Sequence, residues 1–290
     1  MNIRHANSED GEEILRWRND AKTREMSLCT KVVSVDEHDL WMRSRLVDEK
    51  SILFIGQEGE SNVGLCRFDL DQRSECAEIS IVVNPDLRGR KKAKTLLISA
   101  LNAFHAKVRT PVYARIKKRN LASLNVFTAN GFKCLFCGPE YDFFMFSPPN
   151  SSPKFEIVRN CSKHLDILFR LLEQRRQNIS HEAMPTFSQH ATFVASKPYL
   201  GWFLVQLQSD YVGSVYLTAS NTIGLNINQP RIDVVAHCLN RINSDFEPVE
   251  PIPSHVARSF SVNVPIENTE LHNNLIKIGL RPIQTSLSFF

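Results

Sequence analysis

The sequence predicts an α/β fold made of two tandem, related mixed-sheet domains. Three observations predict it: apolar strand-like and helix-like segments alternate along the chain, a short pattern recurs in both halves, and a segment rich in Pro and Ser separates the halves. The recurring pattern occupies residues 120–132 and 268–280. In each copy an Asn opens a helical stretch, an apolar residue follows seven positions later, and a Gly followed by an apolar residue comes after eleven. A duplicated fold is the first hypothesis.

The repeat extends towards the beginning of each half. Residues 78–85 have the apolar character of a buried strand, and an apolar strand carrying a glycine precedes them. The second half has the same order. The matched positions, first half against second, are 38–41 with 190–193, Gly64 with Gly213, and 78–85 with 222–229. Several matches in one order indicate two related domains.

Apolar runs and helical periodicity place the elements of the first half in order. The chain opens with a short strand, continues with two helices and three strands, and then alternates helix and strand. The expected strands are 3–4, 51–55, 63–70, 78–83, 112–116 and 141–146, and the expected helices are 11–17, 35–46, 92–106 and 122–130. No glycine-rich dinucleotide fingerprint accompanies them, so a mixed α/β layer is expected.

A linker separates the two halves. Residues 147–153 (SPPNSSP) cannot continue a helix or a central strand, because Pro lacks a backbone N–H and fixes φ. The strand pattern restarts at Phe155. The expected domains are residues 1–147 and 155–290, joined by residues 148–154. A chain of 290 residues is long enough for two domains that each bury a core.

Composition limits the classes of function. Hydrophobic residues make up 42% of the chain, as in an ordinary globular protein, and the net charge of +4 is too small to indicate nucleic-acid binding. No apolar run approaches a membrane span, and the start lacks the apolar core of a signal peptide. Seven cysteines without framework spacing favour a reducing cytoplasm. Cys134 and Cys137 resemble half a zinc site, but without a second pair no metal is expected.

Several motifs of the first half resemble those of the GNAT superfamily of acyl-CoA-dependent N-acyltransferases. The resemblance covers almost all of the first half. It rests on the strand 78–83, the basic loop 88–93 (RGRKKA), Asn120-x-x-Ser123 and Gly131-Phe132. It implies acetyl-CoA or another acyl-CoA as cosubstrate, and a catalytic GNAT-like domain at residues 1–147.

The start of the chain looks like one branch of this superfamily, the enzymes that acylate amino sugars for flagellin glycans and surface polysaccharides. Residues 15–20 (LRWRND), His38-x-x-Trp41 and the strand 64–69 carry this resemblance. Residues 155–290 look like a second GNAT domain that is also found in polysaccharide loci. The implied acceptor is a small molecule, the amine of an amino sugar, nucleotide-linked in the preferred interpretation.

The basic loop has the chemistry of a pyrophosphate site. A loop that runs from a strand end into a helix turns backbone N–H groups towards one point, and the positive end of the helix attracts the anion. The residues at this position are Arg88, Gly89, Arg90, Lys91, Lys92 and Ala93. The family pattern expects Gly where Lys91 stands, so its side chain either crowds the diphosphate or adds a favourable charge. The alternative is a solvated basic turn that caps a surface helix.

Acyl transfer to an amine requires a base, because a sugar amine is mostly protonated near neutral pH. By resemblance, Glu78 lies beside the reactive end of the cosubstrate and is the first candidate for the general base, directly or through a water. The alternative makes it a strand-end carboxylate paired with a basic neighbour such as Arg67. His38 is a second candidate base, because histidine titrates near neutral pH.

Direct transfer in a ternary complex is expected, because no covalent intermediate is required. Backbone N–H groups of Ile81, Val82 and Val83, freed where the strand splays from its neighbour, are expected to hold the developing oxyanion.

The usual general acid of the superfamily is a Tyr in the helix after the Asn motif, where this chain has Phe127. The proton for the thiolate then comes from Tyr113, Tyr141 or water, or the thiolate leaves unprotonated. Asn120 and Ser123 are candidate cofactor contacts, although an Asn that caps a helix explains Asn120 equally well.

The acceptor site is expected near two short segments of the first half. A sugar needs an aromatic surface for its ring and fixed donors for its hydroxyls, and an Arg would hold a nucleotide diphosphate. The candidates are Trp17, Arg18, Asn19, Trp41 and Arg67. The alternative for each is an ordinary packing or interhelical role.

The second half lacks the basic loop. Its corresponding residues 229–235 read QPRIDVV, Pro230 removes one N–H donor, and Thr222 stands where the first half has Glu78. A GNAT-like domain with a degenerate acyl-CoA loop is expected, serving as a scaffold, as a dimerising surface in a possible homodimer, or as part of the acceptor pocket. Residues that could line a sugar site, or simply form the core, are His181, His190, Tyr199, Trp202 and Tyr216.

Two other functions stay open. One changes the acceptor to a protein N-terminus or an amino acid, and predicts an acidic or peptide-sized cleft. The other is a non-catalytic binding protein of two decayed GNAT folds, which Lys91, Phe127 and the degenerate second loop favour.

Overall fold

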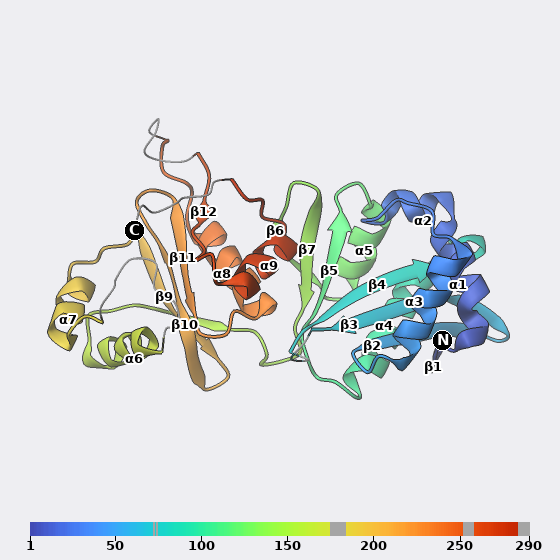
Figure 1. Ribbon diagram of the computed structural model, residues 1–290, viewed down its shortest axis with the longest axis horizontal. Coiled ribbons are helices and arrows are strands. Elements are labelled where there is room, and N and C mark those ends of the chain that lie inside the picture. Colours follow the sequence, from blue (N-terminus) through green and yellow to red (C-terminus); the bar gives the residue numbers. More distant parts are fainter. Residues whose placement is uncertain (72, 74, 175–183, 252–257, 284–290) are drawn as a thin grey trace. The chain divides into compact units, whose positions relative to one another are not determined.

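The computed structural model describes residues 1–71, 73, 75–174, 184–251 and 258–283, and the candidate His181 lies outside them. The chain divides into two units, Met1–Pro148 and Pro149–Phe290. Each unit is built on a mixed sheet with helices, which confirms the predicted fold class (Figure 1). Every helix in the described part of the chain is too short or too polar to cross a membrane.

The sheet of the first unit has seven strands in the order β1-β2-β3-β4-β5-β7-β6. The strands are β1 (Asn2–His5), β2 (Ser51–Glu58), β3 (Ser61–Leu70), β4 (Ala77–Val83), β5 (Val112–Lys117), β6 (Lys133–Cys137) and β7 (Tyr141–Phe146). Neighbours are antiparallel except β4 and β5, which are parallel. Every strand predicted for this half is present, and β6 is an additional one.

The helices of the first unit are α1 (Gly11–Asn19), α2 (Ala21–Met26), α3 (Val35–Val47), α4 (Lys92–His105) and α5 (Leu121–Ala129), with short 3-10 turns η1 (Ser8–Asp10) and η2 (Pro85–Leu87). Ser34 and Glu37 form a capping box at the start of α3, each side chain accepting from the backbone N–H of the other. The sequence did not predict α2, because α2 has no buried residue and therefore no apolar periodicity.

Two apolar clusters cover the two faces of this sheet. Leu53 and Ile55 pack with residues of α1 and α3, whereas Phe54 and Phe68, which point to the other face, pack with α4 and α5. Phe68 stacks on Phe104 of α4 with ring centroids 4.3 Å apart. The helices are therefore held to both faces by buried apolar area, the main favourable term in folding.

β4 and β5 are paired at one end only. The parallel register joins Ala77 to Val112 and Glu78 to Tyr113, and no further pair follows. Beyond this point the two strands diverge (Figure 1). Beyond Glu78, the edge of β4 that faces β5 is therefore open. This opening begins at Glu78 and extends to the other end of β4, where residues 84–91 lead into α4.

The second unit has a five-stranded sheet in the order β12-β11-β10-β9-β8. Its elements are β8 (Lys154–Ile157), α6 (Ser162–Glu173), α7 (Phe187–Ala195), β9 (Gly201–Leu207), β10 (Asp210–Leu217), β11 (Thr222–Ile227), α8 (Ile232–Asp245), β12 (Ser261–Val262) and α9 (Thr269–Ile278). β11 and β12 are parallel and are joined only by the pairs Thr222 with Ser261 and Ile223 with Val262. A parallel pair joined at one end thus occurs in both units.

The repeated Asn-to-Gly pattern has the same local geometry in both units. Asn120 and Asn268 cap α5 and α9, and each side chain accepts a bond of 3.1 Å from the backbone N–H three residues later. Gly131 and Gly279 follow the helices with φ of 85° and 120°, in the left-handed region that glycine adopts without strain. The sequence repeat is therefore also a structural repeat.

Gly64 and Gly213, which occupy matching positions in the two halves, are required for the same reason. A Cβ at Gly64 would lie 2.3 Å from the carbonyl oxygen of Val82, and one at Gly213 would lie 2.2 Å from that of Asn226. In both sheets the neighbouring backbone comes too close for any side chain.

Asp10 ties the first strand to the first helix. Its buried carboxylate, 5% exposed, accepts bonds of 2.7 and 2.6 Å from the Arg4 guanidinium and one of 2.8 Å from the Asn7 N–H. Burial alone would raise the pKa of Asp10, but the bonds from Arg4 and Asn7 outweigh it and lower this pKa below the ordinary value of 3.8. A carboxyl whose folded pKa is depressed stabilises the fold above its unfolded pKa, and this stabilisation disappears as pH falls through the folded pKa.

Replacing Asp10 by Asn is expected to lower the free energy of unfolding at neutral pH by about 2 kcal/mol, because the Arg4 charge loses its partner. The difference should shrink as pH falls through the folded pKa of Asp10, because the wild-type carboxyl then becomes protonated as well. Urea unfolding at neutral pH and over a series of acidic pH values measures this, with the exposed Asp39→Asn as control. A loss that is equal at every pH would contradict the assigned ion pair.

Candidate functional site

The loop between β4 and α4 leads into a helix start whose backbone N–H groups have no capping side chain. It turns through two left-handed residues, Gly89 with φ of 77° and Lys91 with φ of 58°. α4 begins directly after Lys91, whose side chain makes no capping bond. The N–H groups of the first helical turn, which includes Lys92 and Ala93, are therefore available to an anion, and the helix dipole favours one.

Arg88 joins this loop to α2. Its Nη2 lies 2.5 Å from Asp20 Oδ1 and 2.6 Å from the Thr23 hydroxyl. The bond from Arg88 lowers the pKa of Asp20. Sequence reasoning missed Asp20 and Thr23, because nothing in the apolar pattern indicated that α2 exists or lies beside the loop.

The other basic side chains of the loop differ in their surroundings. Lys92 pairs with Glu58 of β2, whereas Arg90 and Lys91 are exposed. The predicted loop residues thus lie together at the start of α4, with two of their cations held by carboxylates and two extending into solvent.

Lys91 adopts the backbone conformation for which the family pattern uses Gly. A side-chain-bearing residue in the left-handed region costs about 1–2 kcal/mol relative to Gly. Lys91→Gly is therefore expected to raise the free energy of unfolding by about 1 kcal/mol, measured by urea unfolding. The control Lys94→Gly, inside the first turn of α4, should lower it by about 1 kcal/mol. A loss of stability in both variants would contradict this assignment.

The open edge of β4 directs alternate N–H groups outwards. The Ala77 N–H donates to Pro111 on the β5 side, and the Asn84 N–H donates to Val63 on the β3 side. Since donors alternate along a strand, the N–H groups of Ile81 and Val83 face the opening, and that of Val82 faces β3. The structure therefore removes Val82 from the three predicted oxyanion donors.

Glu78 lies at the closed end of the opening. Its Oε1 accepts a bond of 2.8 Å from Arg115 Nε, and its Oε2 accepts one of 3.3 Å from the Tyr113 hydroxyl. Burial disfavours the charge of Arg115, but Glu78, together with Tyr141 and Tyr113, outweighs burial and raises the pKa of Arg115. Burial and the Glu78 charge raise the pKa of Tyr113, so its phenol stays protonated. The basic neighbour of Glu78 is thus Arg115, not Arg67.

Arg67 and Trp41 lie on the same sheet face as Glu78. Arg67 is opposite Ser80 and Asp69 is opposite Glu78 in the antiparallel register, so these four side chains point to the face covered by α1 and α3. The Arg67 guanidinium lies 5.7 Å from the centroid of the half-buried Trp41 ring and pairs with Asp69 at 2.8 Å. An aromatic ring, a guanidinium and two carboxylates therefore gather near the closed end of the opening.

Two predicted site residues are buried and are therefore not accessible to a ligand. Trp17 has no exposed surface and packs in the apolar cluster beneath α1 and α3. His38 is 3% exposed, and its Nε2 lies 2.8 Å from the Gly11 carbonyl oxygen, while its ring stacks on Trp41. A base must reach its substrate, so the structure rules against His38 in that role and against Trp17 as a sugar contact.

Arg18 and Asn19 hold the loop that precedes α3. Arg18 Nη2 donates to the Cys29 carbonyl at 3.0 Å. The Asn19 side chain donates to the Val33 carbonyl at 2.8 Å and accepts from the Val33 N–H at 2.9 Å. Both residues therefore position a loop, although Arg18 Nη1 is buried without a hydrogen-bond partner.

The helix after the Asn motif carries no acid. Phe127 is 2% exposed and packs edge-to-face on Phe132. Asn120 caps α5 through the N–H of Ser123, which accounts for its side chain without a ligand. Of the alternative acids, Tyr113 donates to Glu78, and the Tyr141 ring lies 5.6 Å from the Arg115 guanidinium.

The connection between β11 and α8 in the second unit is shorter than the loop between β4 and α4. Only residues 228–231 separate β11 from α8, against residues 84–91 between β4 and α4. Arg231 donates hydrogen bonds of 3.0 and 2.9 Å to the fully buried Asp233 in the first turn of α8. A buried carboxylate thus lies in the first turn of this helix, where its charge disfavours a bound anion.

The predicted aromatic residues of the second unit pack on one another. Tyr199 stacks on Tyr216 with centroids 4.0 Å apart, and Trp202 meets Tyr199 edge-to-face at 5.0 Å. His190 is 6% exposed, and burial lowers its pKa. His190 is therefore buried, whereas Tyr199, Trp202 and Tyr216 pack on one another but stay half-buried, so these contacts leave both interpretations of the group open.

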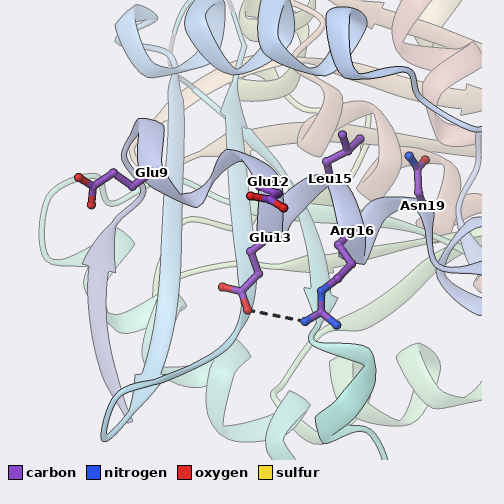
Figure 2. Close-up of a pocket in the computed structure, with 6 residues that line it drawn as sticks. All are labelled: Glu9, Glu12, Glu13, Leu15, Arg16 and Asn19. Carbon is purple, nitrogen blue, oxygen red and sulfur yellow. Dashed lines mark ion pairs between the residues drawn. The ribbon is translucent and has the colours of Figure 1, made fainter.

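A pocket of about 520 Å³ is lined by residues of η1 and α1 (Figure 2). Its lining residues are Glu9, Glu12, Glu13, Leu15, Arg16 and Asn19. Arg16 pairs with Glu13 at 3.8 Å and with Asp86 of η2 at 2.8 Å. The pocket therefore lies near the end of β4 that is remote from Glu78.

Comparison with protein families matches residues 1–133 to the acetyltransferase (GNAT) domain. No curated protein matches the chain. Among solved structures, spermidine N-acetyltransferase from Vibrio cholerae in complex with CoA and spermine is 17% identical. The match covers 50% of this chain and 92% of that chain, with a TM-score of 0.45.

Two further structures are similar over the same share of the chain. An N-acetyltransferase from Staphylococcus aureus Mu50 is 24% identical, with 50% of this chain and 97% of that chain covered and a TM-score of 0.43. The N-acetyltransferase PseH from Campylobacter jejuni is 17% identical, with 50% and 96% covered and a TM-score of 0.41.

The site and the family match agree on the cosubstrate. The uncapped start of α4 and the outward N–H groups of β4 fit the pyrophosphate and the arm of an acyl-CoA. The predicted superfamily is thereby confirmed for residues 1–133. The first unit contains an acetyltransferase domain of the GNAT family. Such a domain is a transferase, and an acyl-CoA fits as its cosubstrate.

Proposed function

We propose that the first unit transfers an acyl group, acetyl in the simplest case, from acyl-CoA to the amine of a nucleotide-linked amino sugar. One observation carries the proposal: the opening between β4 and β5 leads from the uncapped start of α4 to Glu78, on the sheet face that holds Trp41 and Arg67.

Glu78 is the proposed general base. Its carboxylate is held in one orientation by Arg115 and by the Tyr113 hydroxyl, and it can take the amine proton directly or through a water. An acyl-CoA supplies the activated thioester when bound. The outward N–H groups of Ile81 and Val83 are the proposed donors to the developing oxyanion.

The proton for the leaving thiolate is assigned to Tyr141 or to water. Tyr113 is 5% exposed and donates to Glu78, whereas Tyr141 is half-buried and accepts a hydrogen bond from Arg115, which leaves its O–H proton for transfer. The electrostatic effect of Arg115 also lowers the cost of a nearby thiolate.

An amino sugar is supported by the groups around Glu78. Trp41 offers an aromatic surface, Asp69 offers an acceptor for hydroxyls, and Arg67 offers donors suited to a diphosphate. We propose these three residues as acceptor contacts, in place of Trp17, Arg18 and Asn19.

The acidic pocket on α1 does not support the alternative acceptor. Glu78 and Asn84 are six residues apart on an extended strand, or about 20 Å at 3.3 Å per residue. Since the pocket lies beside η2, a peptide amine bound there would be too far from Glu78 to lose its proton to it.

We propose that the second unit is a GNAT-like domain that no longer binds acyl-CoA. The shared one-ended strand pair, the Asn caps and the paired glycines support the common fold. The short loop and the Arg231–Asp233 pair support the loss of the pyrophosphate site.

The test is coenzyme A release from acetyl-CoA with purified full-length protein. Uridine-diphosphate amino sugars, free amino sugars, spermidine, short peptides and amino acids serve as acceptors, with a reaction lacking acceptor as control. Release that depends on a nucleotide amino sugar is expected. Release with peptides or amino acids alone would shift the function to the alternative acceptor, and absence of acetyl-CoA binding by calorimetry would favour a non-catalytic protein.

A further inference from the structure

Two cysteines come into contact on an edge strand of the first sheet. Within the described residues β6 is an edge strand that pairs with β7, and its register shifts between Cys134 and Phe136, so that Leu135 is an extra residue. In a regular strand, residues three apart point to opposite faces. The bulge adds one residue and brings Cys134 and Cys137 to one side.

The two sulfur atoms are 3.6 Å apart, and both residues are exposed. A disulfide requires an approach to about 2.05 Å, so the sulfurs need to move only about 1.5 Å closer. Both side chains lie at the sheet edge, while Leu135 between them is buried at 8% exposure. The local geometry therefore favours closure of this pair.

The surroundings give the two thiols different reactivity. Partial burial of its sulfur, the Cys137 thiol and Asp142 together raise the pKa of Cys134 to about 12. Cys134 is thus a poor first nucleophile near neutral pH. Cys134 Sγ also lies 3.6 Å from the Phe136 carbonyl oxygen, to which it donates, so the first attack is assigned to Cys137.

We propose that Cys134 and Cys137 form a reversible intrachain disulfide by exchange with a small-molecule disulfide. The Cys137 thiolate attacks one sulfur of the reagent, forms a mixed disulfide and releases one thiolate. Cys134 then gives its proton to water, attacks the Cys137 sulfur and expels the second thiolate. Two protein thiols are oxidised, and one reagent disulfide is reduced to two thiols.

Nothing nearby completes a metal site. Among the described residues, no group of three or more His, Cys, Asp or Glu side chains could hold a metal ion. Two sulfurs without further ligands suit oxidation, and a disulfide in a reducing compartment is typically transient.

The experiment treats the full-length protein with oxidised glutathione, blocks the remaining thiols with iodoacetamide and maps each cysteine by mass spectrometry. A peptide bearing Cys134 and Cys137 that has lost two hydrogens is expected. The exposed Cys29 and Cys161 are internal controls and should carry only glutathione or the alkyl group. Alkylation of Cys134 and Cys137 to the same extent as Cys29 and Cys161 would overturn the proposal.

Single variants test the order of attack. Cys134→Ser should accumulate glutathione at position 137, because the resolving thiol is missing, whereas Cys137→Ser should accumulate about ten-fold less at position 134. Equal adducts in both variants would overturn the assigned order. Phenylarsine oxide, which needs two adjacent thiols, should bind the wild type and the Cys29→Ser control but neither single variant. Binding to the single variants would count against the pair.

Discussion

Replacing Glu78 by Gln is expected to slow acyl transfer by about 10²–10⁴-fold, because a positioned general base contributes that much. Gln keeps the size of the side chain and can still bond to Arg115, but it cannot accept the amine proton. The measurement is the rate of coenzyme A release with the best acceptor of the panel, with acetyl-CoA binding followed by calorimetry. Binding should stay within a few-fold of the wild type.

Stability must be followed separately, since Glu78 also neutralises Arg115. A loss of about 1–2 kcal/mol in Glu78→Gln is expected from the weakened bond. Glu78→Asp retains the charge with a shorter reach and should recover part of the rate. The exposed Glu60→Gln is the matched control and should be unaffected. If Glu78→Gln turned over at the wild-type rate, Glu78 would be only the partner of Arg115.

Placing an acidic residue in the first turn of α4 is expected to abolish most acyl-CoA affinity. Ala93→Asp puts a carboxylate among the N–H groups proposed to hold the pyrophosphate, as Asp233 does in the second unit. At an effective dielectric constant near 20, like charges several ångströms apart repel by about 2–4 kcal/mol, or about 30-fold or more in affinity. Calorimetric titration with acetyl-CoA measures the loss.

This substitution separates binding from folding. An acidic residue at a helix N-terminus stabilises the helix by about 0.3–1 kcal/mol, so the melting temperature should stay the same or rise. Ala93→Asn is the isosteric control without charge, and it should lose much less affinity. Equal affinity in the Asp variant and the wild type would place the pyrophosphate elsewhere.

Much of the first unit could be predicted from the sequence because its signals are local. The helix 92–106 and the strand 78–83 were evident from periodicity alone, since apolar residues must face the sheet or the core. The element α2 was missed because it buries nothing, and β6 was missed because a bulge interrupts a five-residue strand. Local patterns cannot report an element that has no local pattern.

The candidate site was predicted less well, because side-chain pairing depends on strands that are distant in sequence. Arg67 was a reasonable partner for Glu78, but it is taken by Asp69 of its own strand. Arg115 reaches Glu78 because β5 lies parallel to β4, with Tyr113 beside Glu78. His38 and Trp17 have the residue types of a site, and only packing against α1 and α3 shows that both are buried.

The sequence by itself determined the α/β class, the repeat and its Asn and Gly positions, and the basic loop of the first half. These depend on backbone conformation and capping within a few residues. The tertiary structure decided which N–H groups of β4 face the opening, which cation neutralises Glu78 and whether two cysteines three apart meet. Each of these depends on register between strands, and a shift of one residue would reverse it.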